Sequence, residues 1–579
     1  MKEKKPKAGF LLGIISFLAI LLLPPAPSMY PPAINIVLKH AHQEVIDKLF
    51  EKTKLQSLED INYQNFQEIL NQSQEIFVSL PSDFHRAGEK GIRLKERKTE
   101  GIKDLKEVIE IQTRGLKNTL ALALLMAIWW IAEVLPISVV ALFPMVLLPL
   151  LGIAHFQYAR LPGYFIVFSP YMHRLVVLFL GGFTIAEAMK RWNLHERIAL
   201  HFIGVIGFSP KRIILGLMIA TAFLSMFISN TATTAMIMPI ALAILIQAGC
   251  QPKKSRFGTS LMLSIAYAAS IGGIGTLIGT PPNVVLAGFA ELLLDIDINF
   301  QNWLVIGLPL VIILLPITWW LLIKINPSEI IKLAGSKKII KDKIKDLGKL
   351  KGGERNTLVI FILTALMWIF RSGFSLGSIH IPGWTQLLGV PWIDDSVIAM
   401  IAVLLFYLSP VNIRKWEFTL DWKTNLNIPW GTLLLFGGGI TIGKALQETG
   451  AAQYIAMHLI ELRSLPIIFI LAAIILLAKF LSEITSNTAT ATMLMPILYA
   501  LGIAIGVDPL SLMIAGAVAT SLVFMLPVAT PPNAIVYDTD YVSMPEMVRN
   551  GLVLQLVTTL IWISLLYYVI SALSPLVNF

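Results

Sequence analysis

Two polar runs lie inside strongly apolar stretches of this chain, and their residues are nearly the same. Ser229–Met236 reads Ser-Asn-Thr-Ala-Thr-Thr-Ala-Met, and Ser486–Met493, 257 residues later, reads Ser-Asn-Thr-Ala-Thr-Ala-Thr-Met. Amides and small hydroxyls in an apolar segment cost free energy unless something binds them. Two copies of such a run therefore predict one binding site that is built from two halves.

A second polar element is also repeated. Thr280–Asn283 and Thr530–Asn533 both read Thr-Pro-Pro-Asn, at a spacing of 250 residues. Two consecutive prolines break a helix, and broken helices leave free carbonyl and N–H groups at their ends. Carbonyl and hydroxyl oxygens suit a monovalent cation such as Na⁺, whereas helix N-termini suit an anion. The same constellation can hold both.

Composition places these elements in a membrane. Of the 579 residues, 56% are hydrophobic and 14% are charged, and apolar runs long enough to cross a bilayer as helices recur throughout. These runs do not alternate apolar and polar residues, which excludes a membrane β-barrel. The net charge of +10 lies largely in short loops, where it sets orientation, so nucleic acid is not a predicted partner. The single Cys250 excludes an internal disulfide and a cysteine-based metal site.

The pattern predicts an all-α polytopic membrane protein with about eleven transmembrane helices and two re-entrant hairpins. The repeats are expected to be inverted, so that the two Ser-Asn-Thr runs approach the membrane midplane from opposite sides. In the first broken helix, Ile271–Gly273 and Gly279–Asn283 are both expected breaks. The expected segments are a transmembrane helix (1–27), an outward-facing extramembrane helical insert (28–117), a first repeat (118–325) with hairpin 211–248 and broken helix 258–289, a basic cytoplasmic linker (326–356), and a second repeat (357–579) with hairpin 464–502 and broken helix 509–537.

The first 27 residues look like a signal peptide, because several lysines precede an apolar run. No small-residue cleavage site follows at once, so we expect a retained helix with its N-terminus in the cytoplasm and the protein in the plasma (inner) membrane. The insert carries apolar residues at helical spacing, which predicts that it packs on itself or on a dimer partner.

Fixed charge is scarce around the two polar runs. Lys479 is the one basic residue near a run, and Glu483 is the only carboxylate near either hairpin tip. A dianion at the midplane would lack countercharge, which bound cations would supply, and this predicts cation-coupled symport. We expect Glu483 to cap backbone or to pair with Lys479 one turn away, rather than to couple protons. The glycines at 181–182 and 437–439 are expected to allow close helix packing or flexibility rather than to contact a ligand.

These repeated residues resemble the divalent anion/sodium symporter (DASS) family, which includes sodium/dicarboxylate, citrate and sulfate cotransporters. The resemblance covers almost the whole chain except about 28–117. It implies a homodimer in which a transport domain moves against a scaffold domain as an elevator, with at least two Na⁺ sites. Family exchangers place basic side chains where the cations would sit, and this chain has none at the matched positions.

The resemblance also implies roles for particular residues. One Na⁺ site would be formed by Ser225, Ser229, Asn230 and Gly279. The mirror Na⁺ site would be formed by Ser482, Thr485, Asn487 and Ala529. The anion would lie between them, against Ser229, Asn230, Thr231, Ser486, Asn487 and Thr488, with Thr530 and Pro531 nearby.

The leading prediction is Na⁺-driven uptake of a C4-dicarboxylate such as succinate, malate or fumarate. A sulfate or tricarboxylate symporter of the same fold stays open, because the sequence does not give the size of the pocket. An anion exchanger, or a channel that conducts without saturation or Na⁺ coupling, is a further alternative. An intramembrane enzyme would need a nucleophile with His or Lys, or facing aspartates. The core spans lack such a set, so no enzyme activity is predicted.

Overall fold

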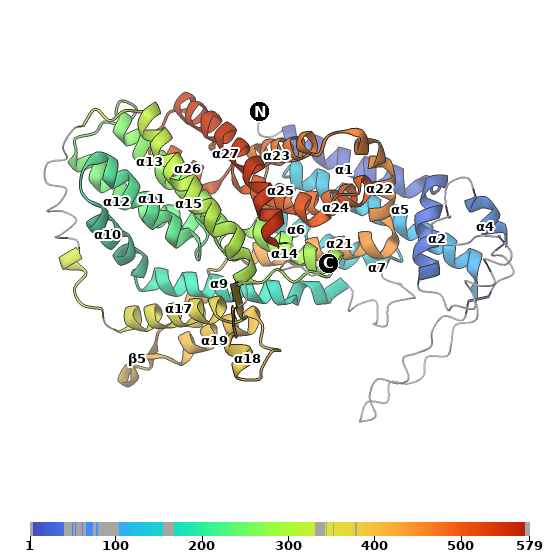
Figure 1. The fold of residues 1–579 in the computed structure, drawn as a ribbon, viewed down its shortest axis with the longest axis horizontal. Coiled ribbons are helices and arrows are strands. Elements are labelled where there is room, and N and C mark those ends of the chain that lie inside the picture. The colour runs from blue at the N-terminus through green and yellow to red at the C-terminus, as the bar shows by residue number, and fades with distance from the viewer. Residues whose placement is uncertain are drawn as a thin grey trace. The chain divides into compact units, whose positions relative to one another are not determined.

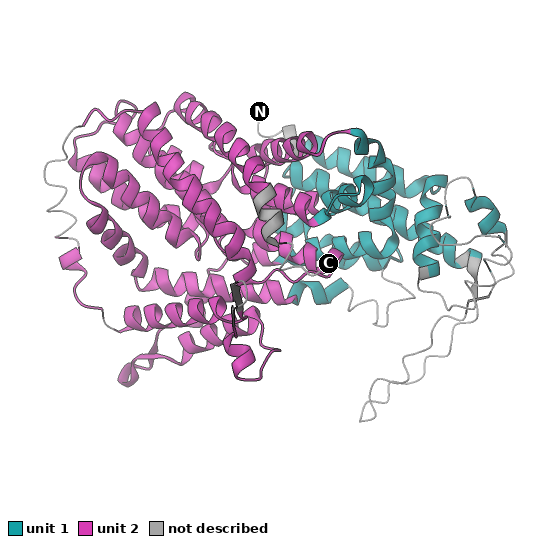
Figure 2. Ribbon diagram, in the orientation of Figure 1, with its two compact units in different colours: residues 1–172, 434–464, 496–509 teal, residues 173–433, 465–495, 510–579 magenta. Residues whose placement is uncertain are grey.

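The fold is that of a computed structural model, and helices dominate it (Figure 1). The structure describes residues 4–39, 49, 53, 61, 65–72, 77–78, 103–153, 167–330, 342, 344–350, 352–376 and 379–573. The chain forms two compact units, each assembled from separate segments (Figure 2). Unit 1 comprises Met1–Met172, Leu434–Ser464 and Pro496–Pro509, and unit 2 comprises His173–Leu433, Leu465–Met495 and Leu510–Phe579.

Unit 1 contains the N-terminal helix and the predicted insert. Helix α1 packs against α5, and small residues allow a close approach, since a Cβ added to Gly13 would lie 2.3 Å from Trp129 Nε1. The helices and strands that begin in unit 1 are α1 (Lys4–Leu22), η1 (Pro27–Met29), α2 (Tyr30–Lys39), α4 (Phe66–Gln72), β1 (Phe77–Val78), β2 (Lys103–Asp104), α5 (Leu105–Ile131), α6 (Ile137–Val140), α7 (Phe143–Leu150), η4 (Ser169–Met172), α22 (Ala451–Leu459) and η6 (Ile460–Ser464).

The insert has a small hydrophobic core of its own. The apolar side chains that the sequence places at helical spacing are buried together, which supports the prediction that the insert packs on itself. They are Ile34, Val37, Leu38, Leu49, Ile61, Phe66, Ile69, Leu70, Val108 and Ile109.

Unit 2 contains both polar runs and both Thr-Pro-Pro-Asn elements. Its helices before residue 330 are α9 (Arg174–Arg191), α10 (Leu194–Ile206), α11 (Pro210–Ser225), α12 (Asn230–Gln247), α13 (Arg256–Ile274), α14 (Pro281–Leu294) and α15 (Phe300–Ile325). Its later elements are α17 (Gly353–Ile369), β3 (Phe374–Leu376), β4 (Ile379–Ile381), α18 (Trp384–Leu387), α19 (Asp395–Leu408), β5 (Pro410–Asn412), η5 (Ile413–Lys415), β6 (Glu417–Phe418), α20 (Trp422–Asn425), α23 (Ile467–Ile484), α26 (Pro531–Tyr537) and α27 (Met544–Leu573).

Three of the described helices have residues in both units: α21 (Trp430–Thr449), α24 (Asn487–Ile505) and α25 (Pro509–Ser521). The strands in the described residues form three antiparallel pairs, β1 with β2, β3 with β4, and β5 with β6. The all-α class that the sequence predicts is confirmed, because these pairs are short and no larger sheet occurs in the described part.

Seven helices among the described residues are long and apolar enough to cross a membrane, or up to eight if α1 and the segment bent from it by 83° form one span. Shorter apolar helices add Ile137–Leu150, Pro281–Leu294, Asp395–Leu408 and Pro509–Ser521. The expected total of about eleven spans stays a prediction.

The sequence predicts two helix breaks within residues 258–289, and the prediction of a break at Ile271–Gly273 is wrong. Helix α13 continues through Gly272 and Gly273 to Ile274, and only residues 275–280 are non-helical before α14. These glycines serve close approach instead, because a Cβ added to Gly272 would lie 2.3 Å from the carbonyl oxygen of Ala222. Gly181 also allows a close helix contact, because a Cβ added to it would lie 2.5 Å from Ala399 Cβ. This agrees with the prediction of close packing at the glycines. In addition, α5 runs without interruption through residues 117 and 118, where the sequence placed the end of the insert.

Candidate functional site

The first polar run forms the turn between α11 and α12. Ser229 is the N-cap of α12, and its Oγ accepts a hydrogen bond from the backbone N–H of Ala232 at 3.3 Å. Ser225 ends α11, and its hydroxyl lies 2.7 Å from Asn230 Oδ1 and 2.8 Å from the carbonyl oxygen of Ala269. Thr231 is exposed.

The break between α13 and α14 lies against this turn. A Cβ added to Gly279 would lie 2.5 Å from the carbonyl oxygen of Gly273, 2.9 Å from that of Ser225 and 3.0 Å from that of Met226. A Cβ added to Gly273 would lie 2.4 Å from Asn230 Oδ1. Three carbonyl oxygens therefore converge beside Gly279, and Asn230 Oδ1 lies beside the neighbouring Gly273 and the Ser225 hydroxyl. Such oxygens suit a hard cation.

Two residues at this break were not singled out from the sequence. Thr276 donates its hydroxyl to the carbonyl oxygen of Met226, which ties the break to the end of α11. Asn283 donates through Nδ2 to the carbonyl oxygens of Thr276 at 2.8 Å and Gly273 at 3.2 Å. The signal for Asn283 was present, since the same asparagine closes both Thr-Pro-Pro-Asn elements, but the partner carbonyls are set by the fold.

The second polar run forms the corresponding turn between α23 and α24. The Thr485 hydroxyl donates to the carbonyl oxygen of Leu481 at 2.9 Å and lies 2.7 Å from Thr490 Oγ1. Ser482 Oγ and Asn487 Oδ1 are buried and have no hydrogen-bond partner in the described structure. Buried polar atoms are normally paired, so these two atoms are candidates for ligand contact.

The break between α25 and α26 is fixed by a carboxylate. Glu483 accepts hydrogen bonds from the backbone N–H groups of Phe524 at 2.9 Å, Met525 at 2.9 Å and Leu526 at 3.0 Å. Thr530 is the N-cap of α26 and accepts from the N–H of Asn533 at 3.2 Å. The prediction that Glu483 caps backbone is confirmed, and it is the non-helical backbone of the break that it caps.

The alternative that Glu483 pairs with Lys479 is wrong. Lys479 is 1% exposed, and its Nζ donates to Thr558 Oγ1 and Thr559 Oγ1 at 2.9 Å each and to the carbonyl oxygen of Gln555 at 3.1 Å. These three acceptors lie on α27 and satisfy the three N–H donors of the ammonium group. Lys479 therefore joins α23 to α27 instead of supplying charge to the hairpin tip.

Elements of the two halves are neighbours within unit 2. Helix α26, which begins with Pro531 after the cap Thr530, packs against α12 and α13. The hydroxyl of Tyr267 on α13 also donates to the carbonyl oxygen of Phe524 in the second break, at 3.1 Å. The helix that begins with the first run thus packs against the helix that begins with the second Thr-Pro-Pro-Asn element. The predicted mirror Na⁺ site is less connected. In the described residues, no hydrogen bond joins its members to one another, which are Ser482, Thr485, Asn487 and Ala529. Ser486 and Thr488 are half-buried and make no hydrogen bond to these residues in the described structure.

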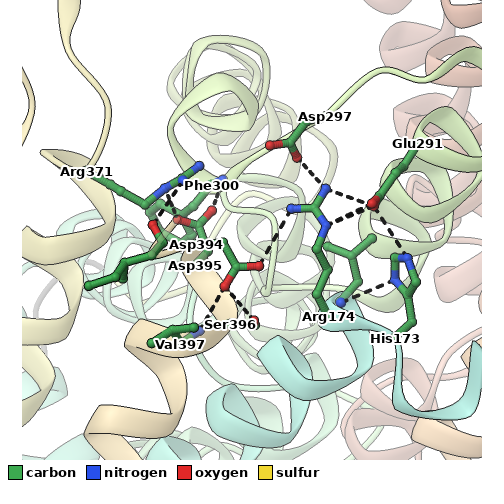
Figure 3. A network of polar contacts seen from close by, with 12 residues as sticks. His173, Arg174, Glu291, Asp297, Phe300, Arg371, Asp394, Asp395, Ser396 and Val397 are labelled. Carbon is green, nitrogen blue, oxygen red and sulfur yellow. Dashed lines mark hydrogen bonds and ion pairs between the residues drawn. The ribbon is translucent and has the colours of Figure 1, made fainter. Parts of the chain in front are cut away.

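An ionic cluster holds the far end of α14 (Figure 3). The guanidinium of Arg174, at the start of α9, contacts Glu291 on α14 at 2.8 Å and Asp297 in the following loop at 2.6 Å. It also lies 3.9 Å from Asp394, the N-cap of α19. Leu277, from the break itself, lines a small cavity together with Arg174 and Asp394. Arg174 therefore anchors the helix that begins at the first break.

Comparison with known proteins gives consistent relatives. Residues 112–573 match the family model described as the sodium:sulfate symporter transmembrane region. The sodium-dependent dicarboxylate transporter SdcS of Staphylococcus saprophyticus is 39% identical over 459 residues, covering 78% of this chain and 85% of that protein. SdcS of Staphylococcus aureus strain USA300 is 41% identical over 458 residues, with the same coverage. Together with the apolar helices, this match confirms an integral, multi-pass membrane protein.

Among solved structures, the YdaH transporter of Alcanivorax borkumensis aligns at 15% identity with a TM-score of 0.49, covering 70% of this chain and 86% of that one.

Proposed function

Because this chain belongs to the sodium:sulfate symporter family, we propose that it is a secondary transporter that carries a C4-dicarboxylate, such as succinate, malate or fumarate, into the cell together with Na⁺. The carboxylates of the substrate would lie between the two polar runs, and Na⁺ would occupy a half-site on either side. The names of the relatives at 39% and 41% identity support the substrate class.

The observation that carries the proposal is the cluster of neutral oxygens beside Gly279. The carbonyls of Ser225, Met226 and Gly273 converge there, and the Asn230 amide lies against the same break. A hard monovalent cation prefers such oxygens, and a bound cation would offset the charge of a dianion in an apolar environment. In the mirror half-site, Ser482 and Asn487 offer buried oxygens with no hydrogen-bond partner in the described structure.

The finer mechanism is also part of this proposal. Two inverted repeats would present the half-sites from opposite sides of the membrane, and a homodimer would support an elevator movement of the part that holds them. The N-terminus would lie in the cytoplasm, on the same side as the basic linker 326–356. The broken helices α13–α14 and α25–α26 support this scheme, since breaks at membrane depth are typical of transporter binding sites.

Uptake of labelled succinate into proteoliposomes tests the proposal. We expect an inward Na⁺ gradient to drive saturable uptake, and replacement of Na⁺ by choline to abolish it. Asn230→Ala and Asn487→Ala should each remove most of the uptake, because each deletes an amide at one polar run. Uptake that is unchanged in choline would overturn the symport. Competition by sulfate but not by malate or fumarate would move the substrate to sulfate.

A further inference from the structure

Two asparagines at equivalent positions of the repeated elements make the same contact. Asn283 Nδ2 donates to the carbonyl oxygen of Thr276 at 2.8 Å, and Asn533 Nδ2 donates to that of Leu526 at 3.0 Å. Leu526 stands 250 residues after Thr276, which is also the spacing between the two asparagines. Both asparagines are 0% exposed. Each half therefore closes its helix break with the same buried amide.

The other end of each amide is free. Asn283 Oδ1 and Asn533 Oδ1 are both buried without a hydrogen-bond partner in the described structure. Since the Nδ2 atoms donate to carbonyls, the orientation of each amide is fixed and the free atom is the oxygen. A buried acceptor without a partner costs about 1–3 kcal/mol. A hydrogen-bond donor or a cation can satisfy such an oxygen, and a cation is the ligand that also suits the neutral carbonyl oxygens beside Gly279.

A matched pair elsewhere in unit 2 behaves differently. Asn326 Nδ2 donates to Asn550 Oδ1 at 2.7 Å, and Asn550 Nδ2 donates to the carbonyl oxygen of Glu546 at 2.7 Å. Asn550 is as buried as the two break asparagines, at 1% exposure, yet both ends of its amide are used. Burial of an asparagine in this unit thus does not always leave its oxygen unpaired, although the oxygen of Asn425, which is 4% exposed, also has no partner in the described structure.

Asn283 also contacts the cluster described above. Its Nδ2 holds the carbonyl oxygen of Gly273 at 3.2 Å, and this oxygen lies 2.5 Å from a Cβ added to Gly279. The amide thus fixes a carbonyl that faces Gly279.

We propose that Asn283 and Asn533 are positioning residues and cation ligands of the two half-sites: each fixes the carbonyls of its break through Nδ2 and presents Oδ1 to Na⁺. The inference rests on the proposed function. Because the amide is held at a fixed position, the number and spacing of oxygens around the cation depend on it, and these determine which cation fits. A loss of either asparagine should therefore change the preference for Na⁺ over the smaller Li⁺.

The experiment measures succinate uptake in proteoliposomes as a function of Na⁺ and, separately, of Li⁺, for the wild type, Asn283→Ala, Asn533→Ala and the control Asn550→Ala. We expect each break variant to raise the half-saturating Na⁺ concentration at least about fivefold, the lower end of usual coupling effects, and to alter the ratio of half-saturating Li⁺ to Na⁺. The control should keep the wild-type ratio. A variant that merely loosens the fold would lower the maximal rate and leave this ratio unchanged.

The outcomes separate the two claims. If wild-type uptake does not depend on Na⁺, the proposed function fails. If wild-type uptake depends on Na⁺ but Asn283→Ala and Asn533→Ala give the Na⁺ and Li⁺ curves of Asn550→Ala, only the present inference fails. Should an alanine variant not accumulate in the membrane, Asn283→Ser and Asn533→Ser carry the test, read out as the rise in melting temperature that Na⁺ produces over choline in detergent. An unreduced rise in both would overturn the inference.

Discussion

Both halves of the candidate site have a helix break that a buried asparagine closes, but the two breaks are fixed differently. In the first half, the carbonyl of Met226 accepts a hydrogen bond from Thr276, and its apolar side chain lies against Gly275. In the second half, the residue 257 positions later is Glu483, and its carboxylate accepts from three consecutive N–H groups. The first break itself is therefore held by neutral contacts and the second break by a formal charge.

A second difference lies one turn earlier on the hairpin arms. Ala222 packs against the backbone at Gly272, whereas the residue 257 positions later is Lys479, which reaches α27. The two halves thus share the buried asparagine that closes the break, while the contacts that support the break differ. The two half-sites should consequently respond differently to equivalent substitutions.

The largest loss of Na⁺-driven uptake is expected from substitution of Glu483. Glu483→Ala removes the acceptor of three hydrogen bonds to a charged group, each contributing about 1.5–3 kcal/mol. The second break would lose its defined shape, and we expect Na⁺-driven uptake to fall at least about 100-fold, which corresponds to about 2.7 kcal/mol. Uptake in proteoliposomes measures it.

Two variants control this prediction. Glu483→Gln keeps one acceptor oxygen and should retain more uptake than Glu483→Ala. Met226→Ala keeps the carbonyl that Thr276 uses and should retain more uptake still. Near-normal uptake by Glu483→Ala would show that the charge does not distinguish the halves.

The next effect is expected at the glycine of the first break. Gly279→Ala would place a Cβ within 3.0 Å of three carbonyl oxygens, so the break or the hairpin turn must shift. We expect at least about a tenfold rise in the half-saturating Na⁺ concentration, equivalent to about 1.4 kcal/mol. The second half already has Ala529 at the equivalent position. The matched variant Ala529→Gly should cost only about 0.4–1 kcal/mol of stability through chain entropy. Equal Na⁺ curves for the two variants would contradict the comparison.

The sequence predicted the helical class from composition, and it predicted a helix break at each Thr-Pro-Pro-Asn element from the paired prolines. The family resemblance implied that Ser225, Asn230 and Gly279 share a Na⁺ site; the structure places these residues near one another, and the site itself stays a prediction. The sequence could not tell why Gly272 and Gly273 are glycines. A glycine can be needed for backbone flexibility or for close approach of a neighbour, and the sequence does not distinguish the two. In the structure, Ala222 and Asn230 lie so close to these glycines that close approach is the reason.

The hydrogen-bond donors to Glu483 could not be predicted from the sequence, for a related reason. A sequence shows Lys479 at a distance of one helical turn, and that pairing is the local expectation. The actual donors are N–H groups about forty residues later, which become available only because the chain leaves the helix after Ser521. Donors created by a break cannot be read from residue types. The orphaned oxygens of Asn283 and Asn533 were unpredictable for the same reason.

A smaller effect is expected at Arg174. Arg174 joins the α14–α15 junction of the first half to α9 and α19 through ion pairs. At the equivalent α26–α27 junction, Glu546 instead accepts a hydrogen bond from the Ser543 N–H at 2.9 Å. Arg174→Gln removes a half-buried cation shared by three carboxylates, so α14 should be less well fixed and the half-saturating Na⁺ concentration should rise about threefold to fivefold, or about 0.7–1 kcal/mol.

The control for Arg174 is another arginine of unit 2. Arg197 pairs with Glu354 at 2.6 Å and joins α10 to α17, away from both breaks. Arg197→Gln should lower the melting temperature without moving the Na⁺ curve. If the two glutamine variants have the same Na⁺ curve, the clamp does not act on the first half-site.

The smallest effect is expected at Lys479, although it is the most buried charged side chain near either run. Lys479→Met replaces an ammonium with an apolar chain of similar volume, and exchanges of buried charges for apolar groups are often neutral. The Thr558 and Thr559 hydroxyls would still donate to the carbonyl of Gln555, as they already do at 3.2 and 2.8 Å. We expect a change in stability within about 1 kcal/mol, with Na⁺-driven uptake close to that of the wild type. Lys479→Ala, which leaves a cavity, should cost about 2–5 kcal/mol. Melting temperature and uptake measure both variants. If Lys479→Met abolished uptake while melting normally, the ammonium would act on the transported ions, and the charge of the second half would include Lys479 as well as Glu483.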